Sequence, residues 1–414
     1  MTKWKVVKLG DVADIIGGGT PDTKNDSYWG GDVPWLTPKD LSGYGSRHIS
    51  KGERNISYQG LTNSSAKMLP AGSVLLTSRA PIGYVAIAKN QLCTNQGFKS
   101  LVLKENADSE FFYYLLKNNV DYIQGMSSGS TFAEISGSQV KALEFKIPSL
   151  DVQKRIAGIL GALDDRIDVL RRENVVLEQM AQAVFQSWFV DFDIVRAKAA
   201  GTPESEVCEK YHITPELYAL FPSALTPDNL PLGWEKKKLG DISQYSKEKT
   251  TNVNIETYVS TENMLPNYGG IEKASSVPET GQSTRYKAGN VLISNIRPYF
   301  KKIWFADREG SCSNDVLVFS SNSIGKCMLY SILAQDAFFD FVMSGANGDK
   351  MPRGNKKHIM TYPVIFPNMD LLNKFENLVA SLFDKKSKNA QQIRALSATR
   401  DALLPKLMNG EIEV

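Results

Sequence analysis

The sequence predicts an α+β fold in which two similar mixed α/β domains lie at opposite ends of an antiparallel coiled coil formed by two long helices. Three observations lead to this prediction. A heptad stripe of apolar residues runs through the middle of the 414-residue chain, a weaker stripe lies near its C-terminus, and the segments before the two stripes repeat each other. If the stripes pair antiparallel, an approximate twofold axis relates the two repeats.

The first stripe predicts one long helix over 151–188. This stretch contains no proline, and at 1.5 Å per residue its length would be roughly 57 Å. One member of the seam is polar, Asn174, and such a residue fixes the register of a helix pair at some cost in stability. The predicted seam residues are Leu163, Ile167, Leu170, Asn174, Leu177, Ala181, Val184 and Trp188.

The second stripe predicts a partner helix over 371–408, within a final segment 371–414. A single exposed stripe would have nothing to bury its apolar side chains against, and this segment supplies the missing partner. The alternative is that both are ordinary long helices packed on separate cores. The apolar positions of the second stripe are Leu382, Ile393, Leu396, Leu403 and Leu407.

The two segments that precede the stripes, 1–150 and 232–370, share the same order of motifs. The stretch from Trp4 to Val12 reappears as Trp234 to Ile242, and Pro81 reappears as Pro298. The triplet 93–95 (CTN) reappears as 312–314 (CSN). Residues 189–231 join the repeats as a linker with short helical pieces, because they contain prolines and turn dipeptides without sustained periodicity.

Composition bounds the function without identifying it. Hydrophobic residues make up 42% and charged residues 22% of the chain, as in a folded globular protein, and the net charge of +3 permits a nucleic-acid partner without requiring one. The four cysteines form no CxxC pair and the three histidines have no metal spacing, so we expect reduced thiols in a cytoplasm and no metal site. The sequence has no signal core and no apolar run long enough to span a membrane.

No constellation of catalytic residues is recognisable. The sequence contains no P-loop, no dinucleotide-binding loop and no Gly-x-Ser-x-Gly elbow, and Gly17–Gly19 is interpreted as a turn. A nuclease-like pattern, Pro227-Asp228 followed by Glu235 and Lys237, is interpreted as chance because the first repeat lacks the acidic residue. We therefore expect no catalytic residues in this chain.

Polar and basic side chains gather in matching loops and strand ends of the two repeats. Arg, Lys, Asn and Gln can contact base edges, whereas Lys, Ser and Thr suit phosphates. For any single residue the alternative is an ordinary solvated loop, but matched loops on two copies of one scaffold favour a shared binding role. The candidates are Lys39, Arg47, Arg54, Ser78, Arg79, Gln96, Lys99, Ser128, Ser130 and Thr131 in the first repeat, and Asn295, Arg297, Tyr299, Lys301, Lys302, Lys350, Arg353, Lys356 and Lys357 in the second.

The sequence resembles the specificity subunits of type I restriction-modification enzymes over essentially its full length. The most specific stretch is 186–198 (QSWFVDFDIVRAK), with a departure at Ile194, where the family usually has proline. The start of the second helix, 369–375 (MDLLNKF), departs more from the family pattern. Further stretches that carry the resemblance are 148–156 (PSLDVQKRI), 220–222 (LFP), 231–234 (PLGW) and 404–412 (LPKLMNGEI).

This resemblance implies that segments 1–150 and 232–370 are target recognition domains, each reading one half of a split, asymmetric double-stranded DNA sequence. The helices would set the unread spacer. The resemblance further implies that the chain has no activity or cofactor of its own. Two modification subunits would bind S-adenosylmethionine and methylate adenine, and restriction subunits would use ATP and Mg²⁺. A self-sufficient DNA enzyme and a coiled-coil scaffold that binds only proteins are the two alternatives.

Overall fold

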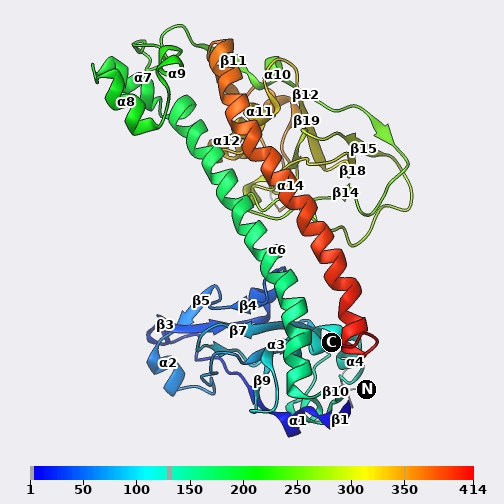
Figure 1. The fold of residues 1–414 in the computed structure, drawn as a ribbon. Helices are drawn as coiled ribbons and strands as arrows, with labels where there is room; N and C mark the ends of the chain where they lie inside the picture. The colour runs from blue at the N-terminus through cyan, green and yellow to red at the C-terminus, as the bar shows by residue number, and fades with distance from the viewer. Residues whose placement is uncertain (1–3, 128–132, 349) are drawn as a thin grey trace. The chain divides into compact units, whose positions relative to one another are not determined.

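The computed structural model describes residues 4–127, 133–348 and 350–414, and the chain forms two compact units. Unit 1 comprises Met1–Arg171 with Gln391–Val414, and unit 2 comprises Arg172–Ala390. Each unit therefore contains one part of each long helix, α6 (Leu150–Phe185) and α14 (Met369–Met408) (Figure 1). The mixed α/β architecture built on two long helices is confirmed.

Unit 1 contains two sheets and a strand pair. β1 (Lys5–Lys8) pairs antiparallel with β10 (Glu144–Ile147), directly before α6. The larger sheet has the order β2-β9-β6-β7-β4 and the smaller has the order β5-β3-β8. Their strands are β2 (Ala13–Gly17), β3 (Trp29–Leu36), β4 (His48–Ile49), β5 (Arg54–Ile56), β6 (Val74–Ser78), β7 (Ile82–Ala88), β8 (Cys93–Thr94) and β9 (Lys99–Leu103).

Short helices join the larger sheet of unit 1 to the long ones. Asp108 caps α3 by accepting a 2.9 Å hydrogen bond from the amide of Phe111, and six consecutive α3 side chains, 111–116, are buried. They share one core with Val152 and Ile156 of α6 and with Leu407 of α14. The helices are α1 (Leu9–Val12), α2 (Tyr58–Thr62), α3 (Ser109–Asn118), α4 (Val120–Gly125) and α5 (Gly137–Ala142), with 3-10 turns η1 (Asp26–Tyr28) and η2 (Pro38–Leu41).

Unit 2 repeats this plan. β11 pairs antiparallel with β20 before α14, as β1 pairs with β10 before α6. Its sheets have the orders β12-β19-β16-β17 and β13-β15-β18-β14. The strands are β11 (Glu235–Lys238), β12 (Ser243–Tyr245), β13 (Lys249–Thr250), β14 (Tyr258–Val259), β15 (Ser283–Tyr286), β16 (Val291–Ser294), β17 (Ile303–Phe305), β18 (Gly310–Cys312), β19 (Val316–Ser321) and β20 (Pro363–Phe366). The short helices are α10 (Leu239–Ile242), η4 (Pro298–Phe300), α11 (Lys326–Leu333), α12 (Asp336–Ser344) and α13 (Lys356–Ile359).

The internal repeat extends to local details of the chain. Asp11 accepts a hydrogen bond from the amide of Lys8 at the start of α1, and Asp241 accepts one from Lys238 at the start of α10. The sheet β5-β3-β8 of unit 1 and the sheet β13-β15-β18-β14 of unit 2 each contain one parallel pair, β3 with β8 and β14 with β18. These correspondences confirm that one scaffold occurs twice.

The long helices run antiparallel within each unit. In unit 2, Glu178 of α6 pairs with Lys386 of α14, and Glu173, one turn earlier in α6, lies by Asn389, later in α14. Asn174 accepts a 3.0 Å hydrogen bond from the Asn389 amide, so the polar position predicted in the first seam meets a buried asparagine on the partner helix.

The predicted seam residues are all shielded from solvent to some extent. The structure buries Ile167, Leu170, Ala181, Trp188 and Leu407, and half-buries Leu163, Asn174, Leu177, Val184, Leu382, Ile393, Leu396 and Leu403. In α14 the neighbour of Leu382, Phe383, is the more deeply buried residue. Trp188 lies beyond α6, in a π-helical turn η3 (Gln186–Val190), where its ring packs against Phe221 and Phe375.

The segment between the repeats folds into three short helices within unit 2. These are α7 (Asp193–Ala199), α8 (Glu204–Tyr211) and α9 (Pro215–Ala219). Lys198 ties them together because its ammonium donates to the carbonyls of Tyr218 and Phe221, at 2.9 and 2.7 Å. Buried side chains of this segment, among them Phe192, join the unit 2 core, so the segment is packed structure with short connecting turns.

Candidate nucleic-acid interface

Two loops of unit 2 that carry predicted DNA-binding residues lie side by side. One follows β16 and spans 295–302, and the other follows α12, spans 347–348 and 350–357, and runs into the first residues of α13. The amide of Arg297 donates to the carbonyl of Pro352 at 2.8 Å, and the amide of Gly354 donates to Asn295 at 3.2 Å. A Cβ at Gly354 would lie 2.8 Å from the Asn295 side-chain oxygen, so this close approach requires glycine.

Most cationic side chains of these loops face solvent. Arg297, Lys350, Lys356 and Lys357 are exposed, and Arg353 is 55% exposed even though it forms a 3.4 Å ion pair with Asp315. Basic side chains at an exposed edge attract phosphates and can contact base edges. The pair of loops therefore forms a basic surface, which we call the unit 2 edge (295–302, 347–348 and 350–357).

Three predicted contacts in the same loops are engaged inside the protein. Lys301 forms a 2.7 Å ion pair with Asp336. The ammonium of Lys302 donates to the Thr261 carbonyl at 2.7 Å, and partial burial lowers its pKa. Asn295 is buried at the strand end. These side chains hold the loop in place, whereas Arg297 and Tyr299 remain available to a ligand.

The equivalent loop of unit 1 makes the same backbone contact with its neighbouring segment. The amide of Ile135 donates to the carbonyl of Ser78 at 3.1 Å, as Gly354 donates to Asn295 in unit 2. Ala80 has a φ of 55° and Arg297 a φ of 50°, each directly before the matched prolines Pro81 and Pro298. The left-handed backbone thus recurs at the same position of both repeats.

The side chains around this loop in unit 1 are less basic at the surface. Arg79 and Lys99 both approach Glu134, at 3.8 and 3.5 Å, and Arg79 remains 40% exposed. Ser78 is fully buried, so it supports the loop as Asn295 does. The predicted contacts Ser128, Ser130 and Thr131 precede Glu134 in the sequence and lie outside the described residues.

The remaining predicted contacts of unit 1, Lys39, Arg54 and Gln96, each contact another side chain of the same unit. Lys39 is 79% exposed and pairs with Glu53 at 2.8 Å. Arg54 lies over the ring of Trp29, 3.7 Å from its centroid, and Gln96 is exposed and accepts a hydrogen bond from Thr20. Two of these side chains, Lys39 and Arg54, are thus already engaged with neighbours within unit 1.

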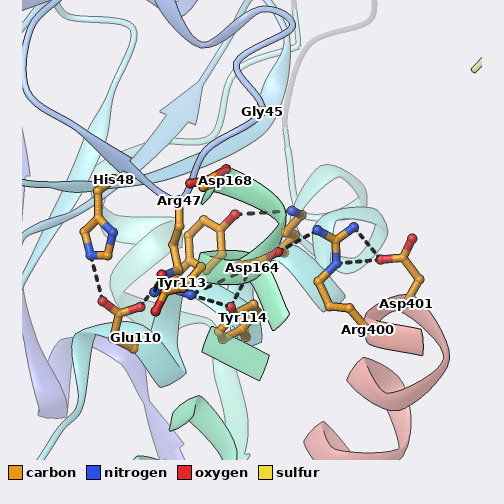
Figure 2. Close-up of polar contacts among 12 residues, drawn as sticks. Gly45, Arg47, His48, Glu110, Tyr113, Tyr114, Asp164, Asp168, Arg400 and Asp401 are labelled. Atoms are coloured by element: carbon orange, nitrogen blue, oxygen red, sulfur yellow. Dashed lines mark hydrogen bonds and ion pairs between the residues drawn. The ribbon is translucent and has the colours of Figure 1, made fainter. Parts of the chain in front are cut away.

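Arg47 requires a correction because its side chain lies inside unit 1 (Figure 2). It forms ion pairs with Glu110 at 2.6 Å and Asp165 at 2.9 Å, and it donates to the Tyr114 hydroxyl at 2.9 Å. Burial acts to lower the pKa of Arg47, but the neighbouring hydroxyl and carboxylates raise it above the usual value. The sequence suggested a loop arginine that is accessible to DNA. In the structure the Arg47 side chain is instead buried among side chains of α3 and α6 and stabilises the fold of unit 1.

The same cluster joins both long helices to the α/β part of unit 1. Tyr114 of α3 donates to Asp164 of α6 at 2.6 Å, and Arg400 of α14 pairs with Asp164 at 2.7 Å (Figure 2). Unit 2 contains the same chemistry: Tyr330 of α11 donates to Glu178 of α6, which pairs with Lys386 of α14. A tyrosine, a carboxylate and a cation thus connect three helices in each unit.

Within the described ranges, no three His, Cys, Asp or Glu side chains are grouped so that they could hold a metal ion. None of the helices described is both long and apolar enough to cross a membrane.

Comparison with known proteins gives one consistent result. Residues 1–179 match the family model of the type I restriction modification DNA specificity domain. The MjaIX type I restriction enzyme specificity subunit of Methanocaldococcus jannaschii is 34% identical, over 99% of this chain and 94% of that protein. The HindI specificity subunit of Haemophilus influenzae is 24% identical over the full length of both chains. The solved S subunit of a type I restriction-modification system from M. genitalium has a TM-score of 0.54 at 17% identity, covering 98% of this chain and 96% of that one, which shows a shared fold.

Proposed function

This chain belongs to the family of type I restriction-modification specificity subunits, and we propose from that premise that each of its two units reads one half of a split, asymmetric DNA target. Members of this family recognise DNA sequence within a restriction-modification complex and are not themselves catalytic, since activity resides in partner subunits. The proposal concerns how this chain divides the recognition between its parts.

The matched loops carry the proposal. In both units a loop that follows a central strand turns through a left-handed residue and a proline, and it is hydrogen-bonded to a second loop. Each unit has an arginine at this turn: Arg297 is exposed, and Arg79 is 40% exposed beside Glu134. Two copies of one reader with different side chains suit two different half-sites, because base contacts are made by the side chains rather than by the scaffold.

The long helices would set the unread spacer between the half-sites. Each unit is built on a part of both helices, and an antiparallel pair with a polar contact, Asn174 with Asn389, has a fixed register. A change in helix length should therefore change the spacer and leave the bases read in each half-site unchanged.

The partners of this chain are the subunits that carry the enzymatic activities of the complex. We propose that two modification subunits bind the chain, each carrying S-adenosylmethionine to methylate adenine in one half-site. Restriction subunits using ATP and Mg²⁺ would join them, and this chain would bind none of these cofactors. The target is chromosomal or invading DNA, so we place the complex in the cytoplasm.

A gel-shift titration with and without the modification subunit tests the proposal. The chain alone should bind DNA weakly and with strong salt dependence, because phosphate contacts dominate nonspecific binding. The complex should prefer one bipartite sequence over a duplex with either half scrambled. Equal affinity of the complete complex for all sequences would contradict the proposal. Methylation by the isolated chain with S-adenosylmethionine would instead support a self-sufficient enzyme.

A further inference from the structure

The unit 2 edge exposes apolar side chains among its basic ones. Tyr299 is 47% exposed, Phe300 39% and Met351 50%, and the rings of Tyr299 and Phe300 lie 4.7 Å apart. Exposed Arg297 and Arg353 flank them in the sequence. Exposed aromatic and methionine side chains among arginines mark a contact surface rather than an ordinary solvated loop.

The turn that carries the two aromatic side chains is hydrogen-bonded to two neighbouring segments. Arg297 and Lys301, at its two ends, both have left-handed backbone, with φ of 50° and 51°. The amide of Asn267 donates to Phe300 at 2.8 Å, and the amide of Tyr268 donates to Lys301 at 3.0 Å. The hydrogen bond from the amide of Arg297 to Pro352 holds the turn from the second segment. A rigid backbone of this kind lowers the entropy lost when the side chains engage a ligand.

Unit 1 lacks these side chains at the equivalent place. After Pro81 the chain continues with Ile82, which is only 6% exposed, and Gly83, where unit 2 has Tyr299 and Phe300 after Pro298. The shared scaffold therefore does not require exposed aromatic residues at this turn. Their presence in unit 2 points to what that unit reads.

We propose that Tyr299, Phe300 and Met351 form an apolar reading surface that contacts the 5-methyl group of thymine in the half-site read by unit 2. The proposal rests on the proposed function and adds the chemistry of one contact. In the major groove the thymine methyl is the apolar feature among the base edges, and apolar side chains distinguish it. The arginines at either side can contact phosphates or a neighbouring guanine.

Photocrosslinking identifies the contact directly. The complex of the full chain with its modification subunits is bound to target duplexes that carry 5-iododeoxyuridine in place of one thymine at a time. Irradiation joins the base at its 5-position to an aromatic or methionine side chain in contact with it. We expect a crosslink at Tyr299, Phe300 or Met351 from one thymine position. Crosslinks confined to other residues of unit 2 would overturn the proposal.

Deoxyuridine substitution then measures the role of the methyl group alone. Replacing the crosslinked thymine by deoxyuridine should weaken binding about fourfold, the value expected for one buried methyl group. The variant Tyr299→Ala/Phe300→Ala/Met351→Ala should bind thymine and deoxyuridine duplexes equally. If the triple variant still bound the deoxyuridine duplex more weakly than the thymine duplex, the proposal would be overturned. It would also be overturned if the unaltered complex bound both duplexes equally, the result expected if the rings insert between base pairs.

Two controls separate this inference from the proposed function and from misfolding. Leu232→Ala removes another exposed apolar side chain of unit 2, outside the edge, and should keep the deoxyuridine effect. Sequence preference in the half-site read by unit 1 should survive in the triple variant, which shows that the complex is intact. If the unaltered complex showed no sequence preference in either half-site, that result would contradict the proposed function itself.

Discussion

Tyr114 donates a 2.6 Å hydrogen bond to Asp164, and both residues are buried where α3 meets α6. Asp164 also accepts from Arg400 of α14 at 2.7 Å, so one carboxylate connects the α/β part of unit 1 to both long helices. Burial and the carboxylate raise the pKa of Tyr114 well above its usual value, and the hydroxyl therefore remains a donor at neutral pH.

Tyr114→Phe should lower the stability of unit 1 by about 2 kcal/mol, because it removes a buried hydrogen bond to a charged group. Tyr330→Phe should act similarly on unit 2 through Glu178. Calorimetry and urea unfolding of the full chain measure both effects. Tyr58→Phe is the matched control, since Tyr58 is 73% exposed, and it should change nothing. A Tyr114→Phe protein as stable as the unaltered one would show that the bond contributes no net stability.

Alkaline pH should unfold the chain above about pH 10, the usual tyrosine pKa. Burial raises the pKa of Tyr113, Tyr114, Tyr286 and Tyr330 in the folded state. Between the unfolded and folded pKa values the folded state holds more protons, so its stability is complete below pH 10 and falls as pH rises further. The part of the tyrosinate absorbance that the buried tyrosines contribute should appear together with the loss of the circular dichroism signal. Ionisation of all tyrosines near pH 10 in a protein that stays folded would contradict this.

Substitution by alanine should affect stability at Arg47 and DNA binding at Arg79. Arg47→Ala removes the arginine partner of half-buried Glu110, leaves buried Asp164 with Arg400 alone, and should cost about 3 kcal/mol of stability. Arg79→Ala should leave stability nearly unchanged and reduce the salt dependence of DNA binding by about one counterion if it contacts a phosphate. Thermal unfolding and affinity measured across a salt series separate the two outcomes. A stable Arg47→Ala protein with weakened DNA binding would restore Arg47 as a DNA contact.

Lengthening both long helices tests whether they set the spacer. Seven residues added between Arg171 and Arg172 and seven between Ala390 and Gln391 preserve the heptad pattern and add about 10 Å to each helix. This corresponds to about three base-pair steps of roughly 3.4 Å. The methylation motif should keep both half-sites and gain about three unread positions. A motif with its original spacer would contradict the proposed role of the helices.

The sequence was informative where one periodicity dominates. The heptad stripes predicted two long helices, and α6 begins at Leu150 and α14 at Met369, within two residues of the predicted starts. The same pattern could not reveal Asp164, because an acidic residue next to seam residue Leu163 is usually exposed on a helix surface. In α14 it favoured Leu382, although its neighbour Phe383 is more buried.

The candidate interface was only partly predictable for a related reason. Composition shows which loops are basic, but not which cations are already paired inside the protein. Arg47 and Lys302 have internal partners that are distant in the sequence. Phe300 and Met351 were missed because apolar residues in a loop suggest burial, and only the structure shows their side chains exposed on a braced turn.

The claim that each unit reads its own half-site is tested most directly by the methylation motif of a complex in which only unit 2 is altered. Arg297→Ala combined with Arg353→Ala removes two exposed cations of the unit 2 edge, and methylated adenines can be mapped across a bacterial genome that expresses the variant with its modification subunit. We predict a bipartite motif in which one half-site becomes less specific while the other half-site and the spacer stay unchanged. Equal loss of specificity in both half-sites, or an unchanged motif, would contradict the account.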